Sequence, residues 1–312
     1  RLQPTQLQDA NGTVQAVALD LFGQVVASWL YGTEYGQTGT VGFSDPQAED
    51  CIPTTVTDLL QQAQSDAVLT VAERYAVDPF SWMAMVSEAQ LSQIAAADQA
   101  ALLQAGVLIR DPAQQAACRL TARGRRWVEG LLQIPDLTRI SAASLAETPG
   151  PIPPHALHVQ ADRYPDADYY PDQQAQQCQV TIAYRDGSGR ALQTLTLDRP
   201  GLAYQLDASG GLVLDETDQP VQADSDPRWA ASGRVEYDNK GQMVRAFQPY
   251  FINDWTYVAA ASLQAQGYAD RHYYDPLGRE VQVDTANGYQ RRIRRYPWFV
   301  VTEDENDTEA AT

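Results

Sequence analysis

The sequence predicts a mainly β protein: an extended antiparallel strip of short strands, with a mixed, largely helical insertion near residues 55–145. Three observations lead to this prediction. A turn pattern, Asp-x-x-Gly, recurs with similar flanking residues. Short runs of alternating apolar and polar residues follow these turns, which is the period of a strand with one dry face. The chain also contains 16 Tyr against 6 Phe, with 18 Pro and 20 Gly, a composition that favours half-exposed strands and turns over a helical bundle.

The clearest copy of the repeated unit is the stretch 273–283. Its Asp275 can accept hydrogen bonds from backbone amides two residues on, and Gly278 can adopt the positive φ that a hairpin turn requires. After the turn, residues 280–284 alternate between polar and apolar side chains. We therefore expect Gly278→Val to damage folding more than Glu280→Gln, because β-branched residues tolerate positive φ poorly.

The copies share an Asp, a Gly three residues later and, in three of them, a Tyr one or two residues before the Asp. Looser copies occupy residues 9–12 and 207–210. Unrelated hairpins with the same turn chemistry are the alternative explanation, but the matching flanks favour a repeat architecture in which each Tyr packs against a neighbouring unit. The repeat positions are Asp20, Gly23, Tyr184, Asp186, Gly189, Arg190, Tyr237, Asp238, Gly241, Tyr274, Asp275, Gly278 and Arg279.

Changes in composition divide the chain into five expected segments. Residues 1–50 contain β-hairpins, and residues 51–148 form the insertion, where Gln and Ala become dense. Residues 149–154 are a Pro-rich connector, because prolines interrupt both helix and sheet. Residues 155–302 are the repeat strip, and residues 303–312 are an acidic tail or linker.

The individual elements follow from local periodicity and from turn residues. In the insertion we expect a strand at 68–75, a helix from Leu91 to Leu103 that Gly106 ends, a strand at 107–110, and a helix at 120–132 that Thr121 caps. Outside it, strands are expected at 14–19, 25–31, 156–160, 179–184, 191–197, 212–214, 233–237, 244–248, 271–274, 280–283, 289–295 and 299–301.

The later part of the insertion resembles the end of a winged-helix DNA-binding domain, because a helix, a short strand and a basic helix follow one another. Charge argues against DNA binding, since specific binders usually carry a basic domain. Here the basic residues are few and lie in an acidic chain, so we expect them to pair with acidic neighbours. They are Arg119, Arg123, Arg125 and Arg126.

The charge balance also limits the possible partners. The chain has 22 Lys and Arg against 40 Asp and Glu, a net charge of −18 that repels nucleic acid and anionic membranes, so neither is expected as a partner. No apolar run approaches the roughly 20 residues of a membrane span, so direct membrane insertion is not expected either. The chain begins at Arg1 with neither an initiator Met nor a signal peptide, and we expect it to be a piece of a longer polypeptide.

Cysteine and histidine supply no recognisable site. Cys51, Cys118 and Cys178 are an odd number at wide spacing, which fits neither a disulfide framework nor a zinc site. His155 and His158 would share a metal only on a helix, and the prolines before them argue against one. Structural roles are therefore expected for them and for His272, and the chain has no Gly-x-Ser-x-Gly motif for acyl transfer.

Acidic and basic clusters are further candidates for a binding or catalytic site. Residues 166–172 begin like a calcium loop, but Pro171 and Gln177 stand where that loop needs Gly and Glu. The carboxylates at 303–307 suit a cation or a glycosidic bond, yet such close packing is more typical of a solvated loop. The run 291–295 is expected to pair with acidic strands. No catalytic, cofactor-binding or metal-binding residue is assigned, and no cofactor is expected.

The Tyr-Asp-x-x-Gly-Arg units resemble Rhs or YD repeats, which makes the hairpins of residues 1–50 YD-type as well. The C-terminal part more closely resembles the repeat region of the SpvB-related B component of bacterial insecticidal Tc toxin complexes. The resemblance is dense over 178–308, recognisable over 1–50 and weak between 51 and 150. It rests on 235–242, 248–255, 274–279, 296–299 and 303–308.

The resemblance implies a secreted, non-enzymatic structural segment of a toxin. In that family the B component and the C component build a hollow β-sheet shell around the toxic C-terminal region of C. The A component, which forms the pore, is contacted through parts of B that this chain does not match. A YD-repeat adhesion or surface-binding protein is the alternative, and a carboxylate-based glycosidase is a third possibility.

Overall fold

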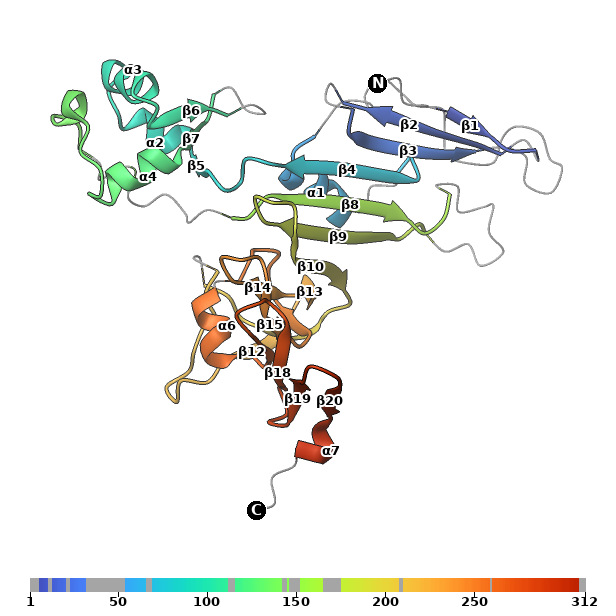
Figure 1. Cartoon of the computed structure of the whole chain (residues 1–312). Coiled ribbons are helices and arrows are strands. Elements are labelled where there is room, and N and C mark those ends of the chain that lie inside the picture. The colour runs from blue at the N-terminus through green and yellow to red at the C-terminus, as the bar shows by residue number, and fades with distance from the viewer. Residues whose placement is uncertain are drawn as a thin grey trace. The chain divides into compact units, whose positions relative to one another are not determined.

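The computed structural model describes residues 6–10, 13–20, 23–31, 54–65, 69–111, 116–141, 145, 152–164, 175–207, 210–258 and 260–308 (Figure 1). Strand makes up 41% and helix 18%, which confirms the mainly β prediction. The chain forms two compact units. The first combines Arg1–Ala76 with Ala156–Thr312, and the second is Val77–His155.

The elements have the following bounds. The strands are β1 (Gln6–Gln8), β2 (Val14–Leu19), β3 (Val25–Tyr31), β4 (Glu73–Asp78), β5 (Ala84–Val86), β6 (Leu108–Arg110), β7 (Cys118–Leu120), β8 (His155–Ala161), β9 (Cys178–Arg185), β10 (Ala191–Asp198), β11 (Gly201–Tyr204), β12 (Gln222–Ser225), β13 (Arg228–Ser232), β14 (Val235–Tyr237), β15 (Met243–Phe247), β16 (Tyr250–Ile252), β17 (Ala269–Tyr274), β18 (Glu280–Asp284), β19 (Gln290–Arg295) and β20 (Val300–Glu303). The helices are α1 (Val56–Gln64), α2 (Glu88–Ser92), α3 (Ala96–Gln104), α4 (Ala122–Val128), the 3-10 helix η2 (Pro135–Leu137), α6 (Ala260–Gln266) and α7 (Glu305–Thr308).

The first unit contains an 11-stranded sheet with the order β1-β2-β3-β4-β8-β9-β10-β13-β16-β11-β12. Its recorded strand pairs are antiparallel, except that β11 and β16 meet in parallel at Tyr204 and Ile252. In β9 and β10 the buried residues alternate with more exposed ones: Val180, Ile182 and Leu195 are fully buried. The period-2 pattern of the sequence therefore places one face of these strands in a core.

The first unit also contains a six-stranded sheet, β14-β15-β17-β18-β19-β20, in which each strand pairs with the previous one in that order. Its hydrophobic burial is sparse, because Phe247 and Val283 are its buried apolar side chains in the described residues. Main-chain pairing and contacts between turns therefore carry much of this sheet.

Some elements of the strip differ from the prediction. The expected strand at 212–214 makes only isolated bridges, Leu206 with Leu212 and Leu214 with Pro220. Strands β11, β12 and β16 and helix α6 were not predicted. For β11 the reason is local: Pro200-Gly201 is typical of a turn, yet Gly201 already pairs with Ser225 of β12.

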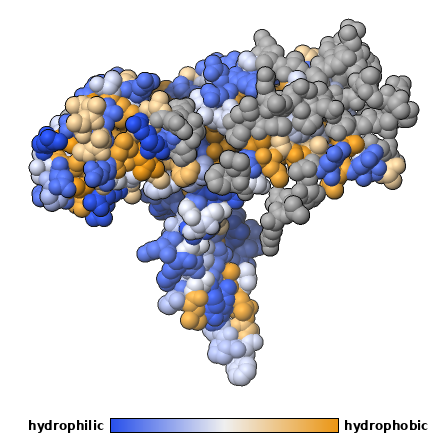
Figure 2. Space-filling view, turned by 90° about the horizontal axis from the view of Figure 1, so that it is seen from above, coloured by the Kyte–Doolittle hydropathy of each residue, from blue (hydrophilic) through white to orange (hydrophobic). Residues whose placement is uncertain are grey.

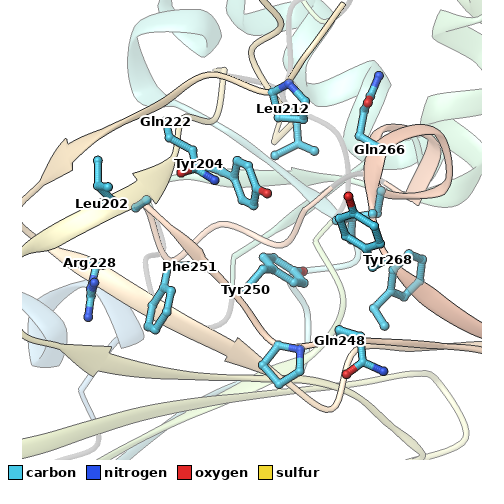
Figure 3. Close-up of a pocket in the computed structure, with 16 residues that line it drawn as sticks. Leu202, Tyr204, Leu212, Gln222, Arg228, Gln248, Tyr250, Phe251, Gln266 and Tyr268 are labelled. Atoms are coloured by element: carbon cyan, nitrogen blue, oxygen red, sulfur yellow. The ribbon is translucent and has the colours of Figure 1, made fainter. Parts of the chain in front are cut away.

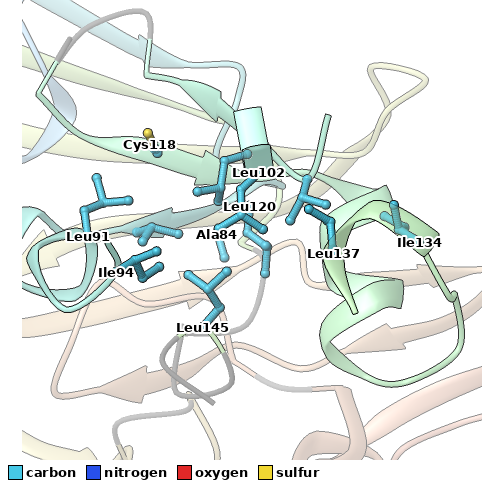
Figure 4. Close-up of a cluster of buried hydrophobic side chains, with 12 residues drawn as sticks. Ala84, Leu91, Ile94, Leu102, Cys118, Leu120, Ile134, Leu137 and Leu145 are labelled. Atoms are coloured by element: carbon cyan, nitrogen blue, oxygen red, sulfur yellow. The ribbon is translucent and has the colours of Figure 1, made fainter. Parts of the chain in front are cut away.

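The second unit has a three-stranded sheet, β5-β7-β6, packed with its helices around one apolar core (Figure 4). The predicted strand and basic helix appear as β6 and α4, and the Thr121 hydroxyl caps α4 by accepting a hydrogen bond from the Gly124 amide at 3.0 Å. The core residues include Val86, Leu91, Leu102, Leu120, Leu137 and Leu145.

The predicted helix from Leu91 to Leu103 is two helices, α2 and α3. The Gln99 carboxamide donates hydrogen bonds to the carbonyls of Leu91 at 2.8 Å and Ile94 at 2.9 Å. These carbonyls, which a continuous helix would bond internally, are satisfied by a side chain, so the chain turns between the two helices. Gly106 follows α3 with a φ of 66°, as the predicted helix stop requires.

The unit boundaries differ from the expected 51–148 insertion. Helix α1 and most of β4 belong to the first unit, because β4 is an interior strand between β3 and β8. The predicted strand at 68–75 accordingly begins later, at Glu73. The described end of the Pro-rich connector is also tied to the second unit: the Ser81 hydroxyl donates to the Pro153 carbonyl at 2.8 Å.

The acidic C-terminal segment is folded as far as Thr308. The Asp304 carboxylate accepts hydrogen bonds from the Asn306 and Asp307 amides at the start of α7, and the Thr308 hydroxyl donates to the Gln290 carbonyl of β19. This segment is therefore a short cap on the last strands and not a free tail. The expected calcium-like loop at 166–172 and Cys51 lie outside the described residues.

The visible surface mixes hydrophilic residues with patches of hydrophobic ones (Figure 2). Several exposed apolar side chains belong to the last hairpin, where Trp298 is 93% exposed and Phe299 and Val300 are each 57% exposed. Among the described helices, none has the length and apolar character needed to cross a membrane.

Candidate functional site

Each predicted repeat turn folds into the same five-residue loop. In the copy at Asp275, the Asp275 amide donates to the Arg279 carbonyl at 2.9 Å, and the Gly278 amide donates to the Asp275 carbonyl at 2.9 Å. One Asp275 carboxylate oxygen accepts from the amides of Leu277 and Arg279, both at 2.9 Å. The carboxylate therefore bridges the loop internally, as its sequence position predicted.

The same pattern recurs in loops 20–24, 186–190, 207–211 and 238–242. In each, the Asp amide donates to the carbonyl four residues on at 2.8–2.9 Å. The Asp carboxylate in turn accepts from the amide of that residue at 2.8–2.9 Å. The looser copy at Asp9 closes in the same way on Thr13, with a carboxylate bond of 2.9 Å. One local chemistry thus shapes the turns of both sheets of the first unit.

The glycine of the loop has a required conformation. Gly278 has a φ of 79°, in the region that side chains other than Gly rarely adopt. The strand register shifts between Tyr273 and Tyr274, so the loop adds a bulge to the hairpin. A bulge increases strand twist, and its repetition gives successive hairpins the same geometry.

Two further loops of this kind were missed by the sequence pattern. In loop 215–219 the glycine place is taken by Asp218, whose φ is 58°, and the Asp215 carboxylate accepts from the Gln219 amide at 3.0 Å. In loop 285–289 the Asp place is taken by Thr285, whose hydroxyl accepts from the Tyr289 amide at 3.1 Å. Asp tolerates positive φ better than most residues, and a Thr hydroxyl can imitate a carboxylate acceptor, so a wider pattern would have found both.

Some of these loops are joined in pairs by contacts that we call latches. In a latch, the side chain just before one loop donates a hydrogen bond to the main-chain carbonyl just after an earlier loop. The Tyr237 hydroxyl donates to the Ala191 carbonyl at 3.1 Å, and the Tyr274 hydroxyl donates to the Met243 carbonyl at 2.7 Å. Both tyrosines thus contact the segment that follows an earlier loop.

A third latch uses arginine. Arg295 lies just before the last turn of the described chain, where the Tyr296 amide donates to the Phe299 carbonyl at 2.9 Å. The Arg295 guanidinium donates to the Glu280 carbonyl at 2.5 Å. Glu280 directly follows the loop at Asp275, so it holds the same position as Ala191 and Met243 in the other latches.

The two tyrosine latches each have a second contact that runs in the opposite direction. The residue that closes one loop reaches the next loop: the Arg190 guanidinium lies 4.4 Å above the Tyr237 ring, and the Gln242 carboxamide donates to the Gly278 carbonyl at 2.8 Å. A Cβ at Gly241 would stand 2.5 Å from an Arg190 nitrogen, and one at Gly278 would stand 2.8 Å from the Gln242 nitrogen. These glycines therefore also provide the space in which the latch closes.

Tyr184 has a different role from Tyr237 and Tyr274. Its side chain is fully buried, its hydroxyl donates to the Trp255 carbonyl, and its ring lies 5.3 Å from the Tyr257 ring. Burial raises the pKa of Tyr184, so the hydroxyl remains a donor. This tyrosine fixes the segment after β16 onto β9.

Arg190 and Arg279 also bind the aspartates of their own loops. Arg190 Nε lies 2.6 Å from Asp186 Oδ2, and Arg279 Nη2 lies 2.7 Å from Asp275 Oδ2. The Arg279 backbone amide, followed by its guanidinium, holds the pKa of Asp275 below its usual range. Because these pairs are solvent-accessible, their main effect is to orient the arginine.

The histidines occupy structural positions. His155 and His158 lie three residues apart on strand β8, which turns their side chains to opposite faces. The His158 ring stacks on Tyr75 at 4.6 Å, and the His272 Nδ1 lies 2.7 Å from a Glu280 carboxylate oxygen. Within the described ranges, no cluster of three or more His, Cys, Asp or Glu side chains is suited to hold a metal.

The arginines of β19 lie beside acidic residues, as predicted. Arg294 pairs with Glu303 at 3.3 Å, and Arg291 lies 3.7 Å from Glu305. Two carboxylates of the acidic C-terminal segment are therefore used in ion pairs with the adjacent strand. This arrangement fits the solvated-loop interpretation better than a cation site.

The basic residues of the second unit divide into two groups. Arg119 is buried and pairs with Asp111 and, at 3.0 Å, with Asp78. Arg123 and Arg126 are exposed, and no described acidic residue pairs with them, so the expected pairing is not found there. In a winged-helix protein, helix α3 would be the helix that enters a groove of the DNA. Here it carries no Lys or Arg.

Solved structures of Tc toxin complexes match the chain along almost its whole length. A crystal structure of TcdB2-TccC3 without its hypervariable C-terminal region is 36% identical with a TM-score of 0.81, and the match covers 98% of this chain and 13% of that one. A Photorhabdus luminescens Tc holotoxin pore carrying a TccC3 mutation gives 36% identity, a TM-score of 0.80 and coverages of 98% and 13%. A further crystal structure of TcdB2-TccC3 gives 31%, 0.67, 98% and 11%. Comparisons with protein-family models and with curated proteins gave no match.

Proposed function

We propose that this chain, which corresponds to a segment of a Tc toxin complex protein, is a non-enzymatic wall segment of the B component. In this proposal it helps the C component to enclose a toxic region before delivery outside the producing cell. The chain spans 13% of the TcdB2-TccC3 chain it matches. That the C component is its partner is therefore also our proposal.

The observation that carries the proposal is the series of latches. Tyr237, Tyr274 and Arg295 each tie one hairpin to an earlier one through a main-chain carbonyl. A sheet linked in this way extends hairpin by hairpin without needing a new apolar core for each step. Such a sheet suits a thin wall better than a compact catalytic domain.

Sheet edges support the same role. Strand β20 is the last strand of its sheet, and its Val300 and Val301 are exposed. Exposed edge strands pair readily with other strands unless something covers them. Closing several sheets into a shell removes such edges and creates an interior separated from solvent.

The carboxylates of the described loops favour a structural role over hydrolysis. Asp275 and Asp215 are each engaged by main-chain amides of their own loops, and Asp304 caps α7. A glycosidase needs two carboxylates facing one another across a substrate site. These groups instead serve turn and helix ends.

The test uses the full-length protein that contains this chain, expressed with its C component. Electron microscopy should show a particle with an internal cavity, and the toxic region should resist a protease that cleaves it when it is expressed alone. Combined Tyr237→Phe and Tyr274→Phe substitutions should accelerate its cleavage on mild heating. Tyr273→Phe with Tyr289→Phe is the matched control, because those side chains make no latch.

Two results would overturn the proposal. One is a particle without a cavity whose toxic region is cleaved as fast as the free region. The other is turnover of a substrate by the repeat region without any partner.

A further inference from the structure

A pocket of about 380 Å³ lies between strands β11, β12 and β16 and helix α6, all within the first unit (Figure 3). Its volume falls within the range of small-molecule sites. Its polar lining comes from three tyrosines and three glutamines: Tyr204, Tyr250, Tyr268, Gln222, Gln248 and Gln266. None of these residues takes part in a latch.

The rings of three tyrosines line the pocket. Figure 3 shows Tyr204, Tyr250 and Tyr268 grouped around one space. The Tyr250 hydroxyl is 3.4 Å from Gln193 Oε1, a long hydrogen bond, and no described residue bonds the hydroxyls of Tyr204 or Tyr268. Tyr268 is 71% exposed, so this lining residue is accessible to a ligand from solvent.

The pocket offers no unpaired charge among its lining residues. Arg228 is its only charged lining residue, and it binds Asp198 at 2.6 Å while lying 4.1 Å above the Phe251 ring. The net charge of −18 also repels anions. Burial raises the pKa of Tyr250, which keeps that hydroxyl neutral. The lining therefore disfavours an anion and offers uncharged hydrogen-bonding groups, which suit a neutral ligand.

We propose that this pocket binds a neutral saccharide. A sugar ring has apolar C–H faces that pack on aromatic rings and hydroxyls at its rim that both donate and accept hydrogen bonds. Phenol hydroxyls and carboxamides likewise donate and accept, so the lining matches that rim. An apolar protein side chain would offer no hydrogen bond to the hydroxyls of Tyr204 and Tyr268. This site is independent of the wall function proposed above.

The test is binding of the intact chain to an array of neutral and anionic glycans, followed by calorimetric titration with lactose, maltose and chitobiose. We expect at least one neutral glycan to bind and sialylated glycans to bind more weakly. Tyr268→Ala should weaken that binding about tenfold, because it removes the exposed ring. Tyr204→Phe, which removes one hydroxyl and keeps the ring, should weaken it by about two- to tenfold.

Tyr289→Ala is the control, since Tyr289 is 44% exposed but does not line the pocket. Circular dichroism of each variant separates loss of binding from loss of fold. Absence of binding to any neutral glycan at millimolar concentration would overturn the proposal. So would saccharide binding that survives Tyr268→Ala, or a pocket that takes only apolar peptides.

Discussion

The loop glycines combine a conformational requirement with a packing requirement, and a matched pair of substitutions separates them from ordinary turn residues. Gly278→Ala should lower the free energy of unfolding by about 1–2 kcal/mol, because Ala at positive φ is strained and its Cβ meets Gln242. Gly187→Ala should be neutral or stabilise slightly, because Gly187 has open space and no positive φ. Chemical denaturation of both variants measures this.

Equal destabilisation by the two alanines would contradict the assigned loop geometry. Gly187 is a better reference than the exchange Glu280→Gln, because Glu280 lies 2.7 Å from His272 and is not a neutral position.

The latch hydroxyls can be tested without disturbing packing. Tyr274→Phe removes only the oxygen that donates to Met243 and should cost about 0.5–1.5 kcal/mol of unfolding free energy. Tyr273→Phe, on the neighbouring position of the same strand, removes a hydroxyl that bonds no described residue and should cost nothing measurable. Urea midpoints that shift equally for the two variants would show that the latch bond contributes no stability.

At the scale of the loop, the bound carboxylates make stability depend on acid. The main-chain amide of Arg279 donates a hydrogen bond to Asp275, and that of Gln219 donates one to Asp215. These bonds are the largest cause that lowers the pKa of each aspartate below the ordinary value of about 3.9. A lowered native pKa stabilises the fold above the unfolded value, and this contribution disappears as the pH falls below about 4. We expect the Tm of the chain to fall there.

Asp275→Asn combined with Asp215→Asn should reduce this acid-dependent fall, whereas Glu216→Gln, an exposed carboxyl without a described hydrogen bond, should leave it unchanged. Melting curves between about pH 6 and pH 2 provide the measurement. A double variant with the same acid dependence as the parent would contradict the role given to the loop carboxylates.

The second unit depends on a buried charged cluster. The Arg119 side chain is 6% exposed and Asp111 is fully buried, so Arg119→Met would remove a buried guanidinium that pairs with that carboxylate. We expect a loss of about 3–5 kcal/mol. Arg139→Met, at a pair whose arginine is 72% exposed, should cost less than about 1 kcal/mol. Urea unfolding followed by tryptophan fluorescence compares them, and similar midpoints would refute the cluster's importance.

At the scale of the whole array, coupling should be confined to neighbouring units. Arg190→Gln and Tyr237→Leu remove groups that touch each other, so their double-mutant cycle should give a coupling of about 0.5–3 kcal/mol. Arg190→Gln and Tyr274→Phe affect different latches and should add within about 0.5 kcal/mol. A comparable coupling in both cycles would mean that the array behaves as one cooperative block.

Much of the β architecture could be predicted because the loop chemistry is local. Asp, Gly and the alternating residues after them specify the loop at Asp275 without help from distant residues. The acceptors of the latches were not predictable, because Tyr237 meets Ala191 across 46 positions and the acceptor is main chain. The predicted helix that contains Leu91 failed because its break depends on one carboxamide, that of Gln99.

The sugar-binding pocket was also invisible in the sequence. Tyr204 lies on β11, Tyr250 on β16 and Tyr268 between α6 and β17, and none carries a motif. The parallel contact between β11 and β16 brings the strands of Tyr204 and Tyr250 together, which a pattern of antiparallel hairpins does not predict.

Each latch has a side-chain half and a main-chain half, and the second half has an evolutionary consequence. The carbonyls of Ala191, Met243 and Glu280 exist whatever amino acid stands there, and Arg295 shows that the donor can change as well. Substitutions at the acceptor positions therefore leave these joints in place. A single inserted or deleted residue in the strand before a loop would move the donor of that strand to the opposite sheet face. Selection on such an array therefore constrains the number of residues between its loops more strictly than the identity of those residues.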